Sequence, residues 1–214
     1  MTALTKTTKP KRRLQERTEN TRASLIQAAI ALFSELGFDG VTIKDIETKA
    51  GVQRGLLVYH FGNKDTLWKA MADTMFVEMA EALQPRLEVM RDINTRDQVA
   101  LIIRFYVRFV AKKPAVARLM SQEARHRSWR IEYLADRHIR DNSVSLRELV
   151  THALGLTEDD FIHWYYMFVG ASSLLFSHAP ECQLLFKKDS QQEDIVERHA
   201  DILVAALLSV KSED

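Results

Sequence analysis

Apolar residues recur along most of the chain at steps of three and four, with few helix-breaking residues between them. In the first such stretch, Leu25, Ala29 and Phe33 fall on one face of a helix. Only four prolines and seven glycines occur in 214 residues, which is too few turn-forming residues for a fold of many short strands. Because 46% of the residues are hydrophobic, the chain can bury a core. The sequence therefore predicts an all-α fold.

Capping residues and apolar spacing together predict about nine or ten helices. Gly37, Gly51 and Gly155 each follow an apolar stretch, as expected of a residue that takes positive φ at a helix C-terminus. Thr42 and Thr157 each precede one, as N-cap residues do. No stretch alternates long enough to predict a strand. The helices with the clearest limits are expected at about 18–36, 42–50, 54–60, 63–83, 99–110, 114–124, 131–154, 158–177 and 193–210.

The cysteine and hydropathy patterns limit where such a chain can work. Cys182 is the single cysteine, so no internal disulfide and no thiolate zinc site can form, and we expect an intracellular protein. We expect Cys182 itself in a loop beside Pro180, with nothing that marks it as a nucleophile. No apolar run approaches the ~20 residues of a membrane-spanning helix, and none follows the basic N-terminus as in a signal peptide. We therefore expect no membrane partner.

Charge is concentrated at the N-terminus, although the formal net charge of the whole chain is only +1. Residues 1–17 carry a net charge of +5, whereas residues 18–64 are neutral. A basic arm is typical of proteins that bind a polyanion, and a solvated tail without a partner is the alternative. We expect residues 1–17 to be disordered when free. The basic side chains of this arm are Lys6, Lys9, Lys11, Arg12, Arg13 and Arg17.

The segment after the first helix has the pattern of a helix-turn-helix. Two short helices, joined by the turn Ala50-Gly51-Val52-Gln53, follow a longer one. Such a unit can place its third helix in a DNA major groove about 12 Å wide. Helical hairpins of this kind also occur in structural roles, so the pattern alone leaves both interpretations open.

Residues 21–68 resemble the DNA-binding domain of the TetR family of transcriptional regulators. The resemblance is collinear over almost fifty residues, and beyond about residue 85 it is one of architecture only. Two positions depart from the family pattern, which usually has Tyr where Val58 stands and often Ser or Thr where Gln53 stands. The matching positions are Ala28, Ala29, Leu32, Phe33, Gly37, Phe38, Thr42, Ile43, Ile46, Ala50, Gly51, Val52, Gly55, Leu57, His60, Phe61, Lys64 and Leu67.

The resemblance implies a basic arm (1–17), a helix-turn-helix domain (18–67) and a helical ligand-binding and dimerisation domain (68–214). It also implies a homodimer that binds double-stranded DNA at a palindromic operator. The positions expected to face DNA are Thr42, Arg54, Gly55, Val58, Tyr59, His60 and Lys64.

These positions divide by the contact each can make. Arg54, Gly55 and Tyr59 are expected to face bases or the groove. Arg54 can read a guanine edge with two hydrogen bonds, and Val58 can touch a thymine methyl. Thr42, Tyr59, His60 and Lys64 are expected on phosphates; Thr42 and Lys64 lie near helix N-termini, which favour anions. Tyr59 and His60 packed against the first helix, and Lys64 as a solvated surface lysine, remain the alternatives.

The C-terminal part is implied to hold an unknown small-molecule effector and the dimer interface. The expected ligand contacts are Met75, Met79, Phe105, Phe109, Met120, Glu123, Trp129 and Trp164; ordinary core packing is the alternative for each. Glu123 lies on an apolar face and needs a partner, either Arg127 four residues later or a ligand amine. The residues expected at the dimer interface are Phe168, Ser172, Leu175, Phe176, Ile202, Leu203 and Ala206.

Two other classes of protein remain to be weighed. Glu123-x-x-His126 matches half of a helical di-iron motif, and Asp160-x-x-His163 is a weaker match; such a site needs two complete motifs and two further carboxylates. A helical adaptor that does not bind DNA leaves the family-matching residues unexplained. We therefore expect no enzyme and no cofactor. The expected protein is a cytoplasmic, nucleoid-associated repressor that a ligand releases from DNA.

Overall fold

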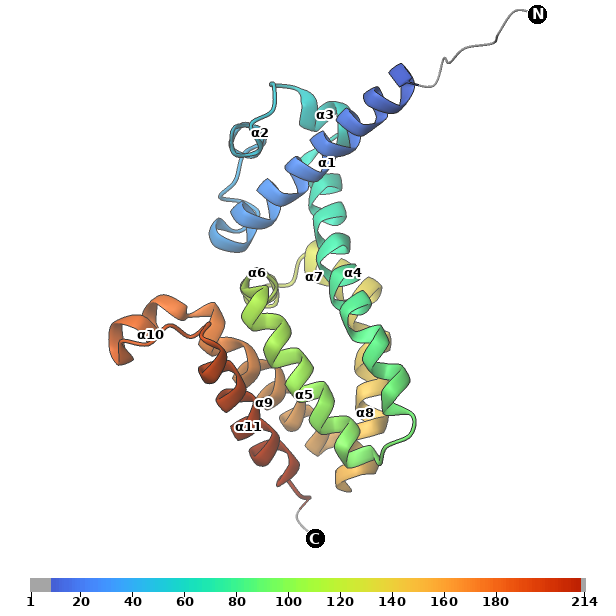
Figure 1. The fold of residues 1–214 in the computed structure, drawn as a ribbon, viewed down its shortest axis with the longest axis vertical. Coiled ribbons are helices and arrows are strands. Elements are labelled where there is room, and N and C mark those ends of the chain that lie inside the picture. Colours follow the sequence, from blue (N-terminus) through green and yellow to red (C-terminus); the bar gives the residue numbers. More distant parts are fainter. Residues whose placement is uncertain (1–8, 213–214) are drawn as a thin grey trace, which may run out of the picture. The chain divides into compact units, whose positions relative to one another are not determined.

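The structure, a computed structural model, describes residues 9–212, with side chains from residue 15 onward. Every regular element in this part of the chain is a helix (Figure 1), so the predicted all-α fold is confirmed. The chain forms two compact units, the first ending at Thr74 and the second beginning at Met75. This division falls inside one long helix and somewhat later than the boundary at 67/68 that the sequence suggests.

The first unit contains three helices and the beginning of a fourth. These are α1 (Lys9–Leu36), α2 (Ile43–Ala50), α3 (Leu56–Phe61) and α4 (Lys64–Met90), the last of which continues into the second unit. Apolar side chains from all four helices meet in one small core, as the helical spacing predicts. The fully buried members of this core include Leu25, Ala29, Phe33, Ile46, Leu57, Leu67 and Met71.

Helix α1 begins earlier than the sequence suggests. The structure has a helix from Lys9, whereas we expected a disordered arm as far as residue 17. Pro10 is tolerated in the first turn of a helix, and no proline or glycine follows it before Gly37. The helix therefore extends through most of the arm. Residues 1–8, with Lys6, and the side chains of Lys9, Lys11, Arg12 and Arg13 lie outside the described part.

The second unit consists of the end of α4 and a bundle of further helices. Their bounds are α5 (Thr95–Lys112), α6 (Pro114–Glu123), α7 (Trp129–Leu134), η1 (Ala135–Ile139), α8 (Arg140–Leu154), α9 (Glu158–Ser177), α10 (Ala179–Phe186) and α11 (Glu193–Leu208). The short π-helix η1 joins α7 to α8 without a break, so 129–154 is one continuous helical stretch, close to the predicted 131–154.

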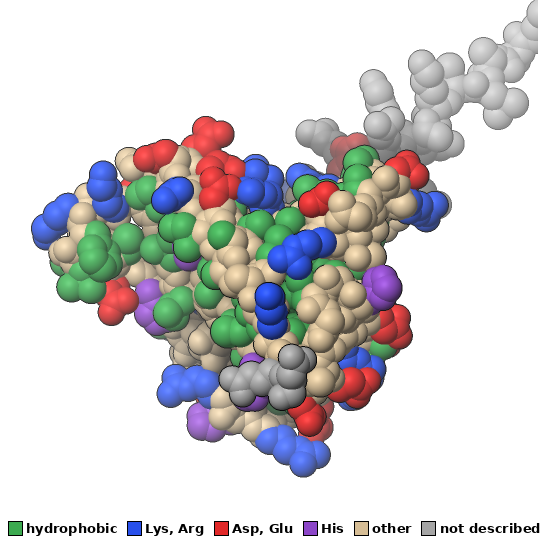
Figure 2. Space-filling view, turned by 90° about the horizontal axis from the view of Figure 1, so that it is seen from below, with side chains coloured by type: hydrophobic (Ala, Val, Ile, Leu, Met, Phe, Trp, Pro, Cys, Tyr) green, Lys and Arg blue, Asp and Glu red, His purple; other side chains and the backbone are tan. Residues whose placement is uncertain are grey.

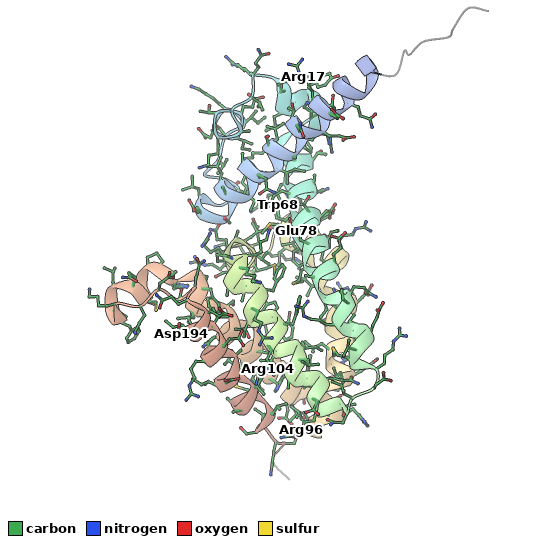
Figure 3. The ribbon with its side chains drawn as sticks, in the orientation of Figure 1. Arg17, Trp68, Glu78, Arg96, Arg104 and Asp194 are labelled. Atoms are coloured by element: carbon green, nitrogen blue, oxygen red, sulfur yellow. The ribbon has the colours of Figure 1, made fainter. Side chains whose placement is uncertain are left out.

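Helix α5 is the centre of this unit and contacts α6, α8, α9 and α11. Charged side chains fasten it to α11, because Arg104 pairs with Asp201 and Arg108 makes a two-pronged ion pair with Glu197. The Arg108 guanidinium lowers the pKa of the Glu197 carboxyl. Figure 3 labels Arg104 on α5, one of the side chains along this contact.

Two further differences from the sequence analysis concern helices that contain a proline. Helix α4 does not stop before Pro85 but runs through it to Met90. Helix α10 was not predicted at all: Cys182, expected in a loop, is buried in this helix. Pro180 lies in its first turn, where proline starts a helix rather than ending one. None of the described helices is both long and apolar enough to span a bilayer.

Candidate nucleic-acid interface and apolar cavity

The turn between α2 and α3 has the geometry of a helix-turn-helix. Gly51 has φ +66° and ends α2, which confirms the positive φ expected there. Its N–H donates to the carbonyl of Thr48, and the N–H of Val52 donates to the carbonyl of Glu47. These bonds close α2 and turn the chain toward α3 within a few residues.

A capping box fixes the start of α2. The hydroxyl of Thr42 donates to Oδ2 of Asp45 at 2.6 Å, and it accepts the backbone N–H of Asp45 at 3.2 Å. The Thr42 hydrogen bonds lower the pKa of the Asp45 carboxyl. The hydroxyl proton of Thr42 is therefore already used, and a phosphate contact through it, which stays a prediction, requires that bond to open.

The N-cap position of α3 is Gly55, which has no side chain to cap the helix. A buried carboxylate from α2 takes this role. Oε1 of Glu47, whose side chain is 5% exposed, accepts the backbone N–H groups of Gly55 at 2.8 Å and Leu57 at 3.0 Å. The sequence analysis missed this residue. Its signal was an acidic side chain next to the buried Ile46, followed by a helix without an N-cap of its own.

One side of α3 is packed and the other is open. Leu57 and Phe61, four residues apart, are buried at 0% and 6% exposure. On the opposite side, Val58 and Tyr59 are 49% and 79% exposed. We call the exposed set Arg54, Gly55, Val58 and Tyr59 the reading face.

The backbone at Gly55 leaves the reading face open. Gly55 has φ +90°, and a Cβ added there would meet no atom within 4 Å. Glycine therefore serves the backbone conformation, and the open space lets another molecule approach the main chain.

The end of α3 is tied to α1. Nη1 of Arg22 donates to the carbonyl of His60 at 2.8 Å, and its guanidinium lies 4.4 Å from the centre of the Phe61 ring. The half-buried His60 ring meets Tyr59 edge-on at 4.9 Å. Packing of the side chain against α1 was the alternative for both residues; Tyr59 is exposed, and the hydrogen bond from α1 to His60 is made to its backbone and not to its ring.

Lys64 does not extend freely into solvent. Its ammonium donates to the carbonyls of Phe38 and Val41, both at 2.9 Å, and lies 4.0 Å from the centre of the Phe38 ring. Lys64 thus joins the start of α4 to the α1–α2 connection. One of its three N–H groups is left for a phosphate. The phosphate contact stays a prediction, and only this third N–H can make it while the other two bonds are in place.

The second unit encloses an apolar cavity of about 1050 Å³. Its wall comes from α4, α5, α6, α8 and α9, with side chains such as Phe76, Met79, Phe105, Met120, Leu146 and Phe161. The π-helix η1 contributes His138, whose ring stacks on Phe76 at 4.6 Å. The volume is at the upper end of the ~300–1,000 Å³ typical of small-molecule sites.

The expected ligand contacts separate into two groups. Met79, Phe105 and Met120 line the cavity. The others lie outside its wall: Met75, Phe109, Glu123, Trp129 and Trp164. The ring of Phe109 stacks on that of the wall residue Phe105 at 5.8 Å, and the fully buried Trp164 donates its indole N–H to the carbonyl of Leu207.

The partner expected for Glu123 is corrected by the structure. Glu123, 4% exposed, pairs with Arg130 at 2.7 Å, and Arg127 pairs with Glu132 instead. Helix α6 ends at Glu123 and Ser128 caps α7, so the helical spacing that would join Glu123 to Arg127 does not exist. A carboxylate already neutralised outside the cavity offers nothing to a ligand amine.

Three tyrosines line the cavity, and two of them, unlike the 69% exposed Tyr166, are largely shielded from solvent. Tyr106 on α5 and Tyr165 on α9 both line it. Burial, with a contribution from the neighbouring Tyr165, raises the pKa of Tyr106 to about 12. Burial also raises the pKa of Tyr165. Both hydroxyls therefore stay protonated at neutral pH.

The residues expected at a dimer interface differ in exposure. Four are buried within the single chain: Phe168, Ser172, Phe176 and Leu203. Three keep accessible surface: Leu175, Ile202 and Ala206. Further apolar surface lies on α10, at the left of Figure 2, where Leu184, Leu185 and Phe186 are each at least 65% exposed. Only accessible side chains can bury surface against a second subunit. Of the residues expected at the interface, Leu175, Ile202 and Ala206 can therefore contribute contact area.

The di-iron spacing does not produce a metal site in the described chain. Glu123 is occupied by Arg130, and His126 is exposed. Within residues 9–212, no group of three or more His, Cys, Asp or Glu side chains is placed to hold a metal ion.

Known proteins match both the helix-turn-helix and the whole fold. Residues 25–71 match the family of bacterial regulatory proteins called the tetR family. The transcriptional repressor AcnR of Corynebacterium glutamicum is 35% identical over 74 residues, which is 34% of this chain and 39% of AcnR. The chain is thus aligned with about two fifths of that relative.

Solved structures extend the likeness in fold to most of the chain. A TetR-like regulator from Rhodococcus sp. RHA1 has a TM-score of 0.63 at 21% identity, covering 87% of this chain and 93% of its own. FadR of Bacillus subtilis, solved in complex with stearoyl-CoA, has a TM-score of 0.61 at 17% identity, covering 87% and 97%. In its helix-turn-helix part, residues 25–71, the chain is therefore similar to the tetR family of bacterial regulatory proteins.

Proposed function

We propose that the chain is a transcriptional repressor that binds a palindromic DNA operator as a homodimer and leaves it when a small molecule enters the cavity. The observation that carries this proposal is the reading face. It is exposed on the outer side of α3, while the inner side is held by a buried core and by the cap from Glu47. AcnR, a relative that is 35% identical over 74 residues, is named as a transcriptional repressor.

The reading face has the chemistry that a major groove requires. Arg54 can bond to the edge of one guanine, a contact worth about 1–3 kcal/mol of discrimination. Val58 offers methyl groups to a thymine, and Gly55 allows the backbone to come close. The hydroxyl of Tyr59 and the third N–H of Lys64 are available to phosphates, which position a protein without reading sequence.

A homodimer would present two reading faces to successive major grooves, about 34–36 Å apart. The accessible apolar side chains of the last helices support a partner there. Ile202 on α11 is 50% exposed, Ala206 is exposed on the same helix one turn further on, and Leu174 on α9 is 58% exposed.

Helix α4 gives a route from the cavity to DNA. The same helix begins in the helix-turn-helix unit at Lys64 and lines the cavity with Phe76 and Met79. A ligand that binds one position of α4 more tightly than another shifts the balance between them, and a changed spacing of the reading faces lowers operator affinity. The complex of FadR with stearoyl-CoA is a precedent for a small molecule in this fold. The expected location is the cytoplasm, at the chromosome.

Selection from a pool of random-sequence duplex DNA by the full chain tests the proposal with no operator sequence chosen beforehand. We expect a palindromic consensus with half-site centres about 10 base pairs apart, and affinity that falls as salt rises. Arg54→Ala should relax the preference at one base of each half-site. The control Arg125→Ala removes the same charge from an exposed site in the second unit and should keep the consensus. A pool that yields no preferred sequence would contradict the proposal.

A further inference from the structure

Among the described residues that line the cavity, the one formally charged side chain is a cation. Arg91, after the end of α4, and His138 in η1 both line the cavity. Among the lining residues within 9–212, none is Asp, Glu or Lys. A buried ammonium needs a carboxylate or an equivalent set of acceptors to replace its lost hydration. This wall provides no carboxylate as a counter-charge for a cation, and the guanidinium of Arg91 repels one.

The same wall presents two phenol hydroxyls that donate to no protein acceptor in the described chain. Within the described chain, neither the Tyr106 hydroxyl nor the Tyr165 hydroxyl has a protein hydrogen-bond partner. Aromatic neighbours hold both rings, since Tyr106 packs against Phe168 at 5.0 Å and Tyr165 against Phe161 at 6.0 Å. A few fixed polar groups in an apolar wall are what orients a ligand in such a site.

We propose that the effector is an acyl compound, that is, a mainly hydrocarbon molecule with a carboxylate or ester oxygen that accepts hydrogen bonds from Tyr106 and Tyr165. This inference rests on the proposed function only in taking the cavity to be the effector site. The hydrocarbon part fills the space between α4, α5, α6, α8 and α9, and a free carboxylate is favoured further by Arg91. A hydrophobic cation of the same length is rejected.

Three probes of equal chain length test this in the full-length protein: dodecanoate, methyl dodecanoate and dodecylammonium, each titrated calorimetrically below its micelle concentration. We expect both acyl probes to bind, and the cation to bind at least tenfold more weakly. The ester and the acid together separate recognition of the carbonyl from recognition of the charge. A cation that binds as tightly as the acyl probes, or acyl probes that fail to bind, would overturn the proposal.

Removing single hydroxyl groups tests the two tyrosines. Tyr106→Phe and Tyr165→Phe should each weaken dodecanoate binding by a factor of roughly 3–10, the usual effect of one lost hydrogen bond. The matched control is Tyr133→Phe, which removes a phenol outside the cavity wall and should leave binding unchanged. Thermal melting of each variant reports folding separately, and the wild-type comparison of the three probes stands without any variant.

Release of the selected operator separates the two proposals. If dodecanoate binds as expected but does not release DNA, the ligand class stands and the proposed mechanism of release falls. If the cation releases DNA and the acyl probes do not, the regulator stands and the ligand class falls.

Discussion

The two units of the chain use their interiors in opposite ways. The first is filled: Leu25, Phe33, Leu57 and Met71 have no exposed surface at all. The second encloses about 1050 Å³ of space between its helices. Protein interiors are normally packed as densely as organic crystals, so the hollow second unit forgoes contacts that the first unit makes. This contrast agrees with the proposed function, in which the densely packed first unit binds DNA and the second unit has room for a small molecule.

Alanine substitution of one methionine in each unit tests this difference in packing. Met71→Ala removes a fully buried side chain of the first unit and should lower the free energy of unfolding by about 2–5 kcal/mol. Met120→Ala removes a side chain that already borders empty space and should cost less than about 1 kcal/mol. Chemical denaturation of the full chain measures both losses, and amide hydrogen exchange assigns each to its unit.

The chemistry of the two substitutions is identical, so each variant is the control for the other. Equal losses would mean that the cavity is closed in solution and that the second unit is packed like the first.

The carboxylate of Glu47 tests what keeps the reading face in place. Glu47→Ala leaves the N–H groups of Gly55 and Leu57 without their acceptor, which should cost about 1–3 kcal/mol of stability. DNA affinity should fall as well, because the start of α3 loses its cap. Denaturation and DNA titration measure the two effects. Glu35→Ala, an exposed position on α1, is the matched control and should change stability by no more than about 0.5 kcal/mol.

The residues of the reading face were expected from the resemblance to the TetR family, and their exposure agrees with the helical period of α3. Once α3 is placed, Leu57 and Phe61 must share one side and Val58 and Tyr59 the other. The partners of Glu47 could not be predicted in the same way. They depend on how the helices cross in space, which no local pattern specifies.

In the second unit, the pattern identified buried residues without showing what they face. Phe105 and Phe109 are both buried, and only Phe105 reaches the cavity. A hydrophobic stripe is the same whether its helix meets a neighbour or a hollow. Glu123 likewise needed a partner, but the one it has, Arg130, is reached only after the chain leaves α6.

Substitution of Lys64 can distinguish a role in stability from a role in DNA binding. Lys64→Ala removes two hydrogen bonds to the α1–α2 connection and should lower stability by about 1 kcal/mol even without DNA. If the third N–H also contacts a phosphate, affinity should fall equally for all sequences. Lys44→Ala, an exposed lysine of the same unit, should change stability little. An unchanged stability of Lys64→Ala would show that the ammonium is free in solution.

The smallest expected effects come from two capping boxes, one in each unit. Asp45 and Asp160 both have a lowered pKa, the first chiefly through Thr42 and the second chiefly through Ser212, with Thr157 next. Thr42→Ala should therefore raise the pKa of Asp45. The pKa of Asp160 should rise more on Ser212→Ala than on Thr157→Ala, and carboxyl NMR titration measures each.

A depressed pKa stabilises the fold above the ordinary aspartate pKa of about 4, and this contribution is lost as pH falls through the lower, folded-state pKa. The alanine variants should consequently lose less stability than the wild type on acidification below that pH, and a larger response of Asp160 to Thr157→Ala would contradict the order of these bonds.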